Sequence, residues 1–364
     1  MTDRGVGIQA IAVSFPSIRR TNDYYREKYP ELLEKSEQKG LARFFSPSSS
    51  APSNVFEEEM IPYLSDPFRG TVDRWVLGEG ESSLTLEYQA ATEALTAAQL
   101  AIAEVDLMLV ASVWPEQIIL GNATFLANRL GFKGAAWNIN GGTGSTPVAL
   151  QTACALVQTG QYRRVLVVVS STYAHFFDET DTISWSLSDG SGAFVVSLLE
   201  SSQGILGTKV VHTGEIDVVS AKPVKDSHGN PQVRMRISNE ANKLANVASA
   251  ELLKTCCEGA AEAAGVSLDQ IDFFLFHTLS AWFARFGARV LGISCDRTIN
   301  LYPHYANCGP VLTVANLYYA AQLEKIKEND LVLVYGMGGA GVAAANVMRW
   351  GKVALGSNPL PGIN

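Results

Sequence analysis

Three side chains have the types and positions to do chemistry: the hydroxyl of Thr143, the imidazole of His277 and the amide of Asn307. Each lies at or soon after the carboxyl end of a segment that the sequence predicts to be a strand. Ligands bind at this edge of open parallel sheets. A hydroxyl held there could act as a nucleophile, and a histidine with an asparagine could activate it or hold a carbonyl oxygen.

Thr143 lies in the turn Gly141-Gly142-Thr143-Gly144, between a short strand and a helix that we expect to run to about Gln158. Glycines allow the backbone to approach a ligand closely. The first turn of the helix offers unpaired N–H groups and a partial positive charge, which suit a nucleophile or an anion. A structural interpretation also fits, in which Thr146 caps the helix and Pro147 takes its first position.

His277 and Asn307 also have structural interpretations. His277 follows the apolar segment 271–276, where a lone histidine can be a hydrogen-bonded core residue. Asn307 precedes a helix and could be only its cap. A second glycine-rich segment, 336–341, joins the last two expected strands, and its backbone N–H groups could point at a carbonyl oxygen.

The chain reads as two halves with the same order of elements: strand, helix, strand, helix, strand, helix, strand, strand. The expected elements of the first half cover residues 5–14, 82–103, 106–113, 121–130, 135–139, 144–159, 163–170 and 188–198. Those of the second half cover residues 204–212, 238–265, 271–276, 279–290, 296–300, 309–323, 330–336 and 341–349. The continuous apolar run at 165–169 is typical of a strand buried on both faces of a parallel sheet.

The register of the two halves indicates a duplication. The same offset of 164 residues relates Thr143 to Asn307 and Val113 to His277. The repeat implies similar halves packed together with their corresponding loops facing each other. This favours functional roles for the three polar residues. We therefore predict an N-terminal half at 1–200, with a long cap-like excursion at about 20–80, and a C-terminal half at 201–364.

Composition limits the classes of function. The chain has 364 residues, of which 47% are hydrophobic and 18% charged, so it can bury a large core. A net charge of −8 argues against nucleic acid as a partner. No apolar run reaches the roughly 18 residues of a membrane span, and no signal peptide is recognisable. The five cysteines lack metal-type spacing, which favours a reducing cytoplasm and no metal site.

The full set of motifs resembles the thiolase-like condensing enzymes, and among them the ketosynthase III group. The resemblance rests on five motifs that occur in the family's order and spacing: the glycine turn at 141–144, Asp189-Gly190-Ser191-Gly192-Ala193, His277, Tyr305-Ala306-Asn307 and Gly338-Gly339. The resemblance implies a duplicated, five-layered αβαβα fold, an α/β architecture that is normally a homodimer. It also implies catalytic roles for Thr143, His277 and Asn307, with an oxyanion held by the Thr143 amide and the Gly338–Gly339 region.

The departures from the family pattern bear on function. Thr143 stands where the family has its nucleophilic cysteine, and Trp282 aligns with a basic residue that contacts the carrier or coenzyme A in relatives. A cysteine is a few per cent thiolate at neutral pH, whereas a threonine hydroxyl needs a positioned base. His277 is the candidate base. Alternatively, His277 and Asn307 bind a thioester carbonyl while a second substrate attacks directly.

The sequence therefore predicts an atypical ketosynthase III-like acyltransferase of specialised, polyketide- or fatty-acid-type metabolism. It would take an acyl group from coenzyme A or from the phosphopantetheine of an acyl carrier protein, with no other cofactor. An acidic carrier needs a basic patch, for which the candidates are Arg129, Lys133, Arg285 and Arg289, beside Trp282. We expect a homodimer; a heterodimer is the alternative. A non-catalytic partner subunit of a condensing heterodimer is the second functional hypothesis, and a thioester hydrolase is the third.

Overall fold

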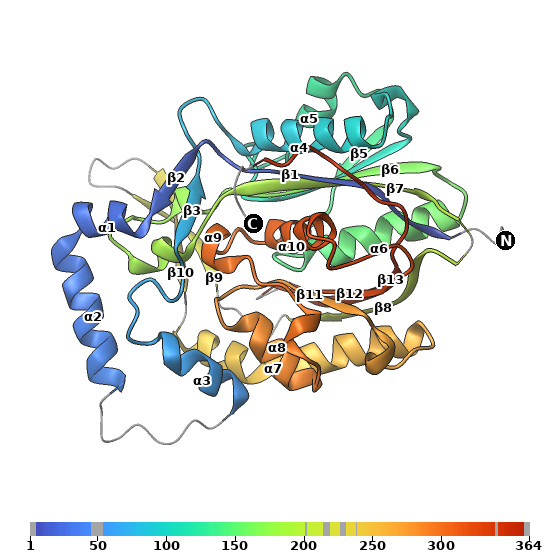
Figure 1. The fold of residues 1–364 in the computed structure, drawn as a ribbon. Coiled ribbons are helices and arrows are strands. Elements are labelled where there is room, and N and C mark those ends of the chain that lie inside the picture. The colour runs from blue at the N-terminus through green and yellow to red at the C-terminus, as the bar shows by residue number, and fades with distance from the viewer. Residues whose placement is uncertain are drawn as a thin grey trace.

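The computed structural model describes residues 5–44, 54–200, 202–213, 219–225, 231–237, 239–338 and 341–359. Two sheets lie one above the other, with two helices between them and further helices on their outer faces (Figure 1). This is the five-layered α/β arrangement expected from the sequence, which is thereby confirmed. None of the helices in these ranges is long and apolar enough to cross a membrane.

The first sheet has the strand order β14-β1-β7-β6-β4-β5, and the second has the order β11-β12-β13-β8. The strands of the first sheet are β1 (Val6–Ser14), β4 (Leu107–Val113), β5 (Ala135–Asn138), β6 (Arg164–Ser171), β7 (Gly190–Leu198) and β14 (Ala354–Leu355). Those of the second are β8 (Gly204–His212), β11 (Phe273–Phe276), β12 (Leu331–Met337) and β13 (Val342–Arg349). β4 pairs in parallel with both β5 and β6, and β11 pairs in parallel with β12.

Six helices complete the layers. They are α4 (Ser83–Ala97), α5 (Ala123–Leu130), α6 (Ser145–Gln158), α7 (Asn239–Ala263), α8 (Phe283–Leu291) and α10 (Val311–Gln322). α4 and α5 cover the outer face of the first sheet, and α7 and α8 cover that of the second. α6 and α10 lie between the sheets. The functional loops are therefore carried by rigid elements that are packed on both sides.

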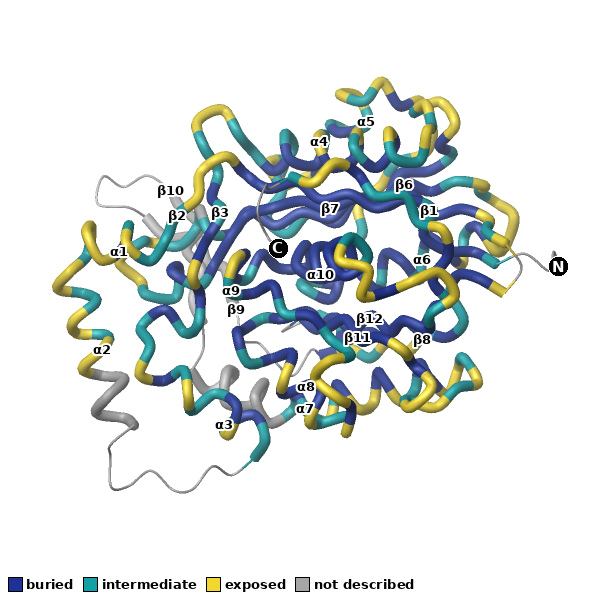
Figure 2. The backbone as a smooth tube through the Cα atoms, viewed as in Figure 1, coloured by how far each residue is buried: buried dark blue, intermediate teal, exposed yellow. Residues whose placement is uncertain are grey.

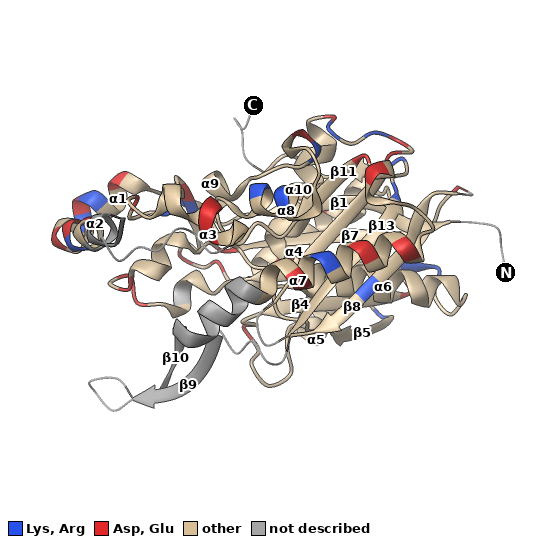
Figure 3. Cartoon of the chain, turned by 90° about the horizontal axis from the view of Figure 1, so that it is seen from below, with Lys and Arg blue, Asp and Glu red and all other residues tan. Residues whose placement is uncertain are grey.

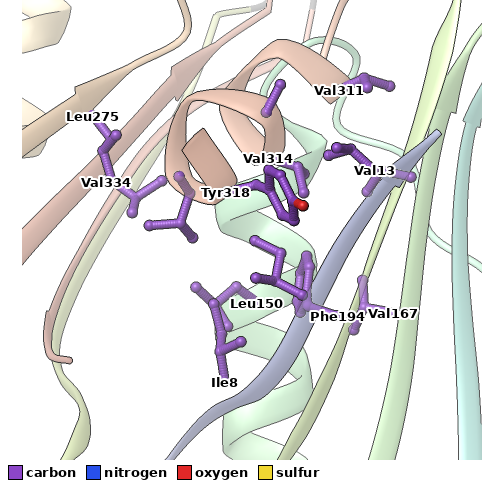
Figure 4. Close-up of a cluster of buried hydrophobic side chains, with 14 of the residues drawn as sticks. Ile8, Val13, Leu150, Val167, Phe194, Leu275, Val311, Val314, Tyr318 and Val334 are labelled. Atoms are coloured by element: carbon purple, nitrogen blue, oxygen red, sulfur yellow. The ribbon is translucent and has the colours of Figure 1, made fainter. Parts of the chain in front are cut away.

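The core lies where α6 and α10 meet both sheets. Figure 4 shows Leu150 of α6, Val314 and Tyr318 of α10, and Phe194 of β7 packed together in this middle layer. Residues 311–320 of α10 are all buried, because sheets lie on both sides of the helix (Figure 2). Burial of each large apolar side chain contributes about 1.5–3 kcal/mol, so this layer is the main source of stability.

Local structure supports the predicted repeat. α5 and α8 end at Gly131 and Gly292, and both glycines have a φ of 67° in the left-handed region. The hydroxyl of Thr146 donates to the carbonyl of Pro310, its counterpart at the 164-residue offset, at 2.8 Å. Thr146 is therefore not the N-cap of α6, as its structural interpretation had it. The N-cap is Gly144, and the Thr146 side chain joins the two central helices instead.

Two expected elements differ in the structure. The strand predicted at 296–300 is wrong: this segment contains a 3₁₀ turn, Cys295–Arg297, and contacts the sheet only through a single bridge between Phe274 and Thr298. The Arg297 guanidinium donates to the carbonyls of Leu268 and Asp269, which precede β11. The helix expected from residue 279 begins four residues later, at Phe283. The hairpin β9 (Val219–Lys225) and β10 (Pro231–Ile237) was not predicted.

The excursion at 20–80 is closed at its base by a two-stranded sheet. The two strands of this sheet are β2 (Ile18–Thr21) and β3 (Asp73–Val76), and the helices between them are α1 (Asn22–Lys28), α2 (Pro30–Phe44) and α3 (Val55–Met60). The short helix α9 (Tyr302–Tyr305) packs against β3. The serine- and proline-rich segment 44–55, which the sequence predicts to be a loop, lies largely outside the described residues. The guanidinium of Arg74 is fully buried between the rings of Tyr25 and Phe68 and donates to the Trp185 carbonyl. This buried contact holds the excursion against the loop that follows β6.

Candidate active site

The glycine turn places Thr143 at the start of α6, opposite the end of β12. Gly142 adopts a φ of 62°, which an L-residue rarely tolerates. A Cβ atom on Gly338 would lie 3.0 Å from the Thr143 nitrogen and 3.0 Å from the Gly141 carbonyl oxygen. The two turns can approach this closely only because glycine occupies both of them.

The hydroxyl of Thr143 donates a hydrogen bond of 2.5 Å to the backbone carbonyl of Met337. Thr143 itself is partly exposed. A carbonyl oxygen orients the hydroxyl but cannot take its proton, because an amide is far too weak a base. In this conformation the hydroxyl is therefore positioned and not activated.

His277 follows β11, and its backbone N–H donates to the Tyr335 carbonyl at 2.9 Å. The side chain is 2% exposed, and burial lowers its pKa to about 4, although the Asn307 side chain and the Met337 carbonyl act in the opposite direction. Neither ring nitrogen has a partner with good hydrogen-bond geometry among the described residues. His277 is thus a neutral imidazole at physiological pH, with polar atoms free for a ligand.

Asn307 is held by its backbone and by its side chain. Its N–H donates to the Ser186 carbonyl at 2.9 Å, and its own carbonyl accepts from the Ser188 N–H at 3.0 Å. Its side-chain oxygen accepts from the Tyr173 hydroxyl at 2.6 Å. The structure therefore brings together the three residues predicted from the sequence, since Met337 contacts both Thr143 and His277, and His277 contacts Asn307.

The oxyanion donors that the resemblance implies are only partly present. The Gly338 N–H donates to the Val342 carbonyl at 2.9 Å, within the turn that joins β12 and β13, so it is not free to bind an oxyanion. The expectation for Gly338 is wrong for this conformation. Gly339 lies outside the described residues. The Thr143 N–H has no hydrogen-bond partner among the described residues and is the remaining backbone donor.

An open pocket of about 650 Å³ adjoins the glycine turn. Its walls are largely apolar; they are formed by Ser112, Val113, Trp114, Pro115, Ile118, Asn140, Gly141, Gly142, Gly341 and Val342. Trp114 adopts a φ of 65° and stacks on Phe176, with the ring centroids 4.7 Å apart. The sequence analysis did not single out Trp114, because its left-handed backbone and its stacking depend on contacts far along the chain.

The sequence analysis also missed Glu87, a fully buried carboxylate beside this pocket. It accepts hydrogen bonds of 2.5 Å from the hydroxyls of Ser112 and Ser170 and of 2.9 Å from the Asn122 amide. Burial raises its pKa to about 7, and the hydrogen bonds only partly oppose this. One signal was available: Glu87 falls on the buried stripe of α4, next to Leu86 and three residues before Ala90.

Ionisation of Glu87 should make the fold less stable as the pH rises. In the folded protein the carboxyl keeps its proton until about pH 7, whereas its pKa in the unfolded chain is 4.5. The free-energy cost of the buried charge therefore develops as the pH rises from the lower to the higher of these values. The free energy of unfolding of Glu87→Gln minus that of wild type should rise by up to about 3 kcal/mol between about pH 4.5 and about pH 8. Urea unfolding across this range measures the gain. The exposed Glu79→Gln serves as the control, and parallel curves for wild type and Glu87→Gln would contradict the prediction.

The basic residues proposed for docking do not form one patch. Arg129 and Lys133 lie at the end of α5, where Arg129 stacks over Tyr88, whereas Arg285 and Arg289 lie on α8 outside the other sheet. No group of three or more metal-type ligands occurs among the described residues.

The excursion covers α8. Arg289 pairs with Glu58 at 2.6 Å and with Glu59 at 2.7 Å, and Arg285 pairs with Glu59 at 3.0 Å. Figure 3 shows the acidic residues of α3 beside the basic residues of α8. Trp282 packs against Phe56 and Tyr63, with ring centroids 6.1 and 5.5 Å apart. The charges of the two arginines are therefore largely compensated within the chain.

Comparisons of sequence agree with this architecture. Residues 138–214 match the family model of 3-oxoacyl-[acyl-carrier-protein] synthase III, and residues 261–350 match the model of its C-terminal part. These segments contain Thr143, His277 and Asn307. The beta-ketoacyl-[acyl-carrier-protein] synthase III of Rhizobium meliloti (strain 1021) is 28% identical over 292 residues, which cover 77% of this chain and 88% of the relative. The enzyme of the same name from Brucella canis is 27% identical over 291 residues, with the same coverage of the two chains.

Solved structures agree in fold. The 3-oxoacyl-[acyl-carrier-protein] synthase III of Aquifex aeolicus VF5 superposes with a TM-score of 0.76 at 23% identity, covering 95% of this chain and all of that one. A variant of OleA from Xanthomonas campestris gives 0.77 at 16% identity, covering 96% of this chain and all of that one. Both halves of the chain are therefore similar in sequence to 3-oxoacyl-[acyl-carrier-protein] synthase III, and the chain has the same fold as these solved structures.

Proposed function

We propose that this protein is an atypical acyltransferase of the ketosynthase III type, which moves an acyl group from a thioester of an acyl carrier protein or coenzyme A to a second nucleophile. The observation that carries the proposal is the meeting of Thr143, His277 and Asn307 beside a largely apolar pocket. An acyl chain suits such a pocket, and the polar groups suit the thioester carbonyl. Polyketide- or fatty-acid-type metabolism supplies substrates of this chemistry.

In this proposal the His277 ring and the Asn307 amide donate hydrogen bonds to the thioester carbonyl, and the Thr143 N–H adds a backbone donor. These donors stabilise the negative charge that develops on the oxygen as the nucleophile attacks. Because the Thr143 hydroxyl is bound to a carbonyl and His277 has a low pKa, direct attack by the second substrate is favoured over acylation of Thr143. The leaving thiolate takes a proton from the incoming nucleophile or from water.

The test is the release of free thiol from a panel of acyl thioesters, on carrier protein and on coenzyme A, in the presence of alcohol, amine and malonyl acceptors. Mass spectrometry of the products then distinguishes transfer from hydrolysis. Thiol release with an acylated acceptor supports the proposal. Thiol release with only the free acid supports a hydrolase, and no release by folded protein contradicts both.

A non-catalytic partner subunit is the second candidate, because the Thr143 hydroxyl is held by the Met337 carbonyl and not by a base. We also propose that the chain dimerises through the edge of the first sheet. Among the strands that the structure describes, β5 pairs only with β4, and the adjoining loop exposes Ile118, Ile119 and Leu120 at 70, 94 and 64%. An open edge beside exposed apolar side chains is typical of an interface. Sedimentation of the protein alone and with candidate partners separates a homodimer from a heterodimer.

Docking of a carrier near α8 can be tested with a charge swap. Arg289→Glu should slow transfer from a carrier protein about tenfold, and transfer from coenzyme A less, because an acidic partner loses a steering charge. The variant also breaks the ion pairs with Glu58 and Glu59, and the double variant Arg289→Glu/Glu58→Arg restores the first of these with reversed sign. The carrier reaction should stay slow in the double variant. Recovery to the wild-type rate would mean that Arg289 only holds α3.

A further inference from the structure

The Gly309 N–H and the Tyr173 hydroxyl together hold the Asn307 amide in one orientation. The side-chain oxygen of Asn307 accepts from the Tyr173 hydroxyl at 2.6 Å and from the Gly309 N–H at 3.0 Å. A backbone N–H can only donate, so the atom facing Gly309 must be the amide oxygen and not the nitrogen. The amide nitrogen of Asn307 is consequently directed away from these two donors.

Tyr173 is itself firmly placed. It is 6% exposed, and the residues on either side of it are both bound: the Thr172 hydroxyl donates to the Trp114 carbonyl at 3.1 Å, and the Ala174 N–H donates to Asp189 at 3.0 Å. Gly309 packs against the ring so closely that a Cβ atom there would lie 3.1 Å from a ring carbon. Burial also raises the pKa of the phenol well above its ordinary value, so the hydroxyl remains a donor at every pH at which the protein works.

The backbone of Asn307 is fixed independently, through Ser186 and Ser188. Rotation of the side-chain amide is therefore the freedom that remains, and the Tyr173 hydroxyl and the Gly309 N–H restrict it together. A rotated amide would present its oxygen to the site, and an oxygen repels the carbonyl of a thioester instead of binding it. The direction of the amide thus decides whether Asn307 can act as a donor.

We propose that Tyr173 is a positioning residue that keeps the Asn307 amide nitrogen directed at the substrate carbonyl. This rests on the proposed function, since it assumes that Asn307 binds a thioester carbonyl. Tyr173 touches neither substrate nor reacting atoms in this account, and its effect reaches the reaction through Asn307 alone.

The test is a double-mutant cycle of Tyr173→Phe and Asn307→Ala, measured with an acyl thioester that wild type turns over. Tyr173→Phe should lower kcat about tenfold and leave KM within about twofold, because it disturbs a donor that matters most in the transition state. In the Asn307→Ala background the same change should have no further effect. Tyr318→Phe is the matched control: it removes another buried tyrosine hydroxyl, which donates to Gly356 in the core, and should not change kcat.

The outcomes are distinguishable. Equal losses from Tyr173→Phe in both backgrounds would show a structural role and overturn the proposal, as would an unchanged kcat in the single variant. Inactive wild type would overturn the proposed function and this inference together. If Tyr173→Phe does not fold, Tyr173→Met, which also lacks the hydroxyl, replaces it in the cycle; failure of both to fold would overturn the positioning role.

Discussion

Replacement of His277 by alanine should reduce acyl transfer by about 10²–10⁴-fold and leave the protein folded. The imidazole is buried at the end of β11 without a well-formed hydrogen bond among the described residues, so its removal breaks little of the native structure. Its loss takes away the ring that lies beside the Asn307 side chain and the Met337 carbonyl. Steady-state kinetics with circular dichroism measures both effects.

Asn307→Ala should cause a similar loss of activity. His277→Gln gives a matched comparison, because an amide can donate a hydrogen bond but cannot act as a base. Partial activity in His277→Gln would support the donor role that the neutral ring suggests. If the alanine variants unfold while the wild-type rate survives in any soluble fraction, the two residues are structural.

The pH profile tests the same assignment. A pKa of about 4 means that the neutral imidazole persists throughout the neutral range, so kcat/KM should not fall on its account until the pH approaches about 4. A loss of activity centred near the ordinary histidine value of about 6.5 would contradict the buried, neutral ring.

The second prediction concerns Thr143, whose replacement separates the direct route from the covalent one. Thr143→Ala removes the hydroxyl that donates to Met337, but it leaves the Thr143 backbone N–H in place. If the second substrate attacks the thioester directly, the alanine variant should keep its activity within about tenfold of wild type. A loss as large as that of His277→Ala would instead show that the hydroxyl carries the acyl group, and the covalent route would replace the direct one.

The position of the three site residues could be predicted because it follows from the repeat. The 164-residue offset that relates Thr143 to Asn307 is the same offset that joins Thr146 to Pro310 in the structure, and it reflects the way that α6 and α10 cross between the sheets. Apolar runs such as 165–169 identified the buried strands, since both faces of a central strand must be apolar.

The direction of polar side chains could not be predicted from the same patterns. Thr143 binds Met337, which lies 194 residues away, and Arg289 pairs with Glu58 on an excursion that the repeat does not include. The expected strand at 296–300 is replaced by a 3₁₀ turn, where the Arg297 guanidinium binds the carbonyl of Leu268, 29 residues earlier in the chain. Periodicity predicts which face of an element is buried, but contacts between distant side chains depend on the completed fold.

The central claim is that this site holds an acyl thioester, and intact-protein mass spectrometry of Thr143→Cys tests it most directly. A cysteine is no larger than threonine and leaves at most a small cavity, and its thiol would lie at the N-terminus of α6, which favours the thiolate. The protein would be incubated with short, branched and aromatic acyl thioesters, with wild type and Thr143→Cys/His277→Ala as controls. The account predicts that Thr143→Cys gains the mass of one acyl group from at least one donor. A folded variant that gains no acyl mass from any of them would contradict the account and favour a non-catalytic partner subunit.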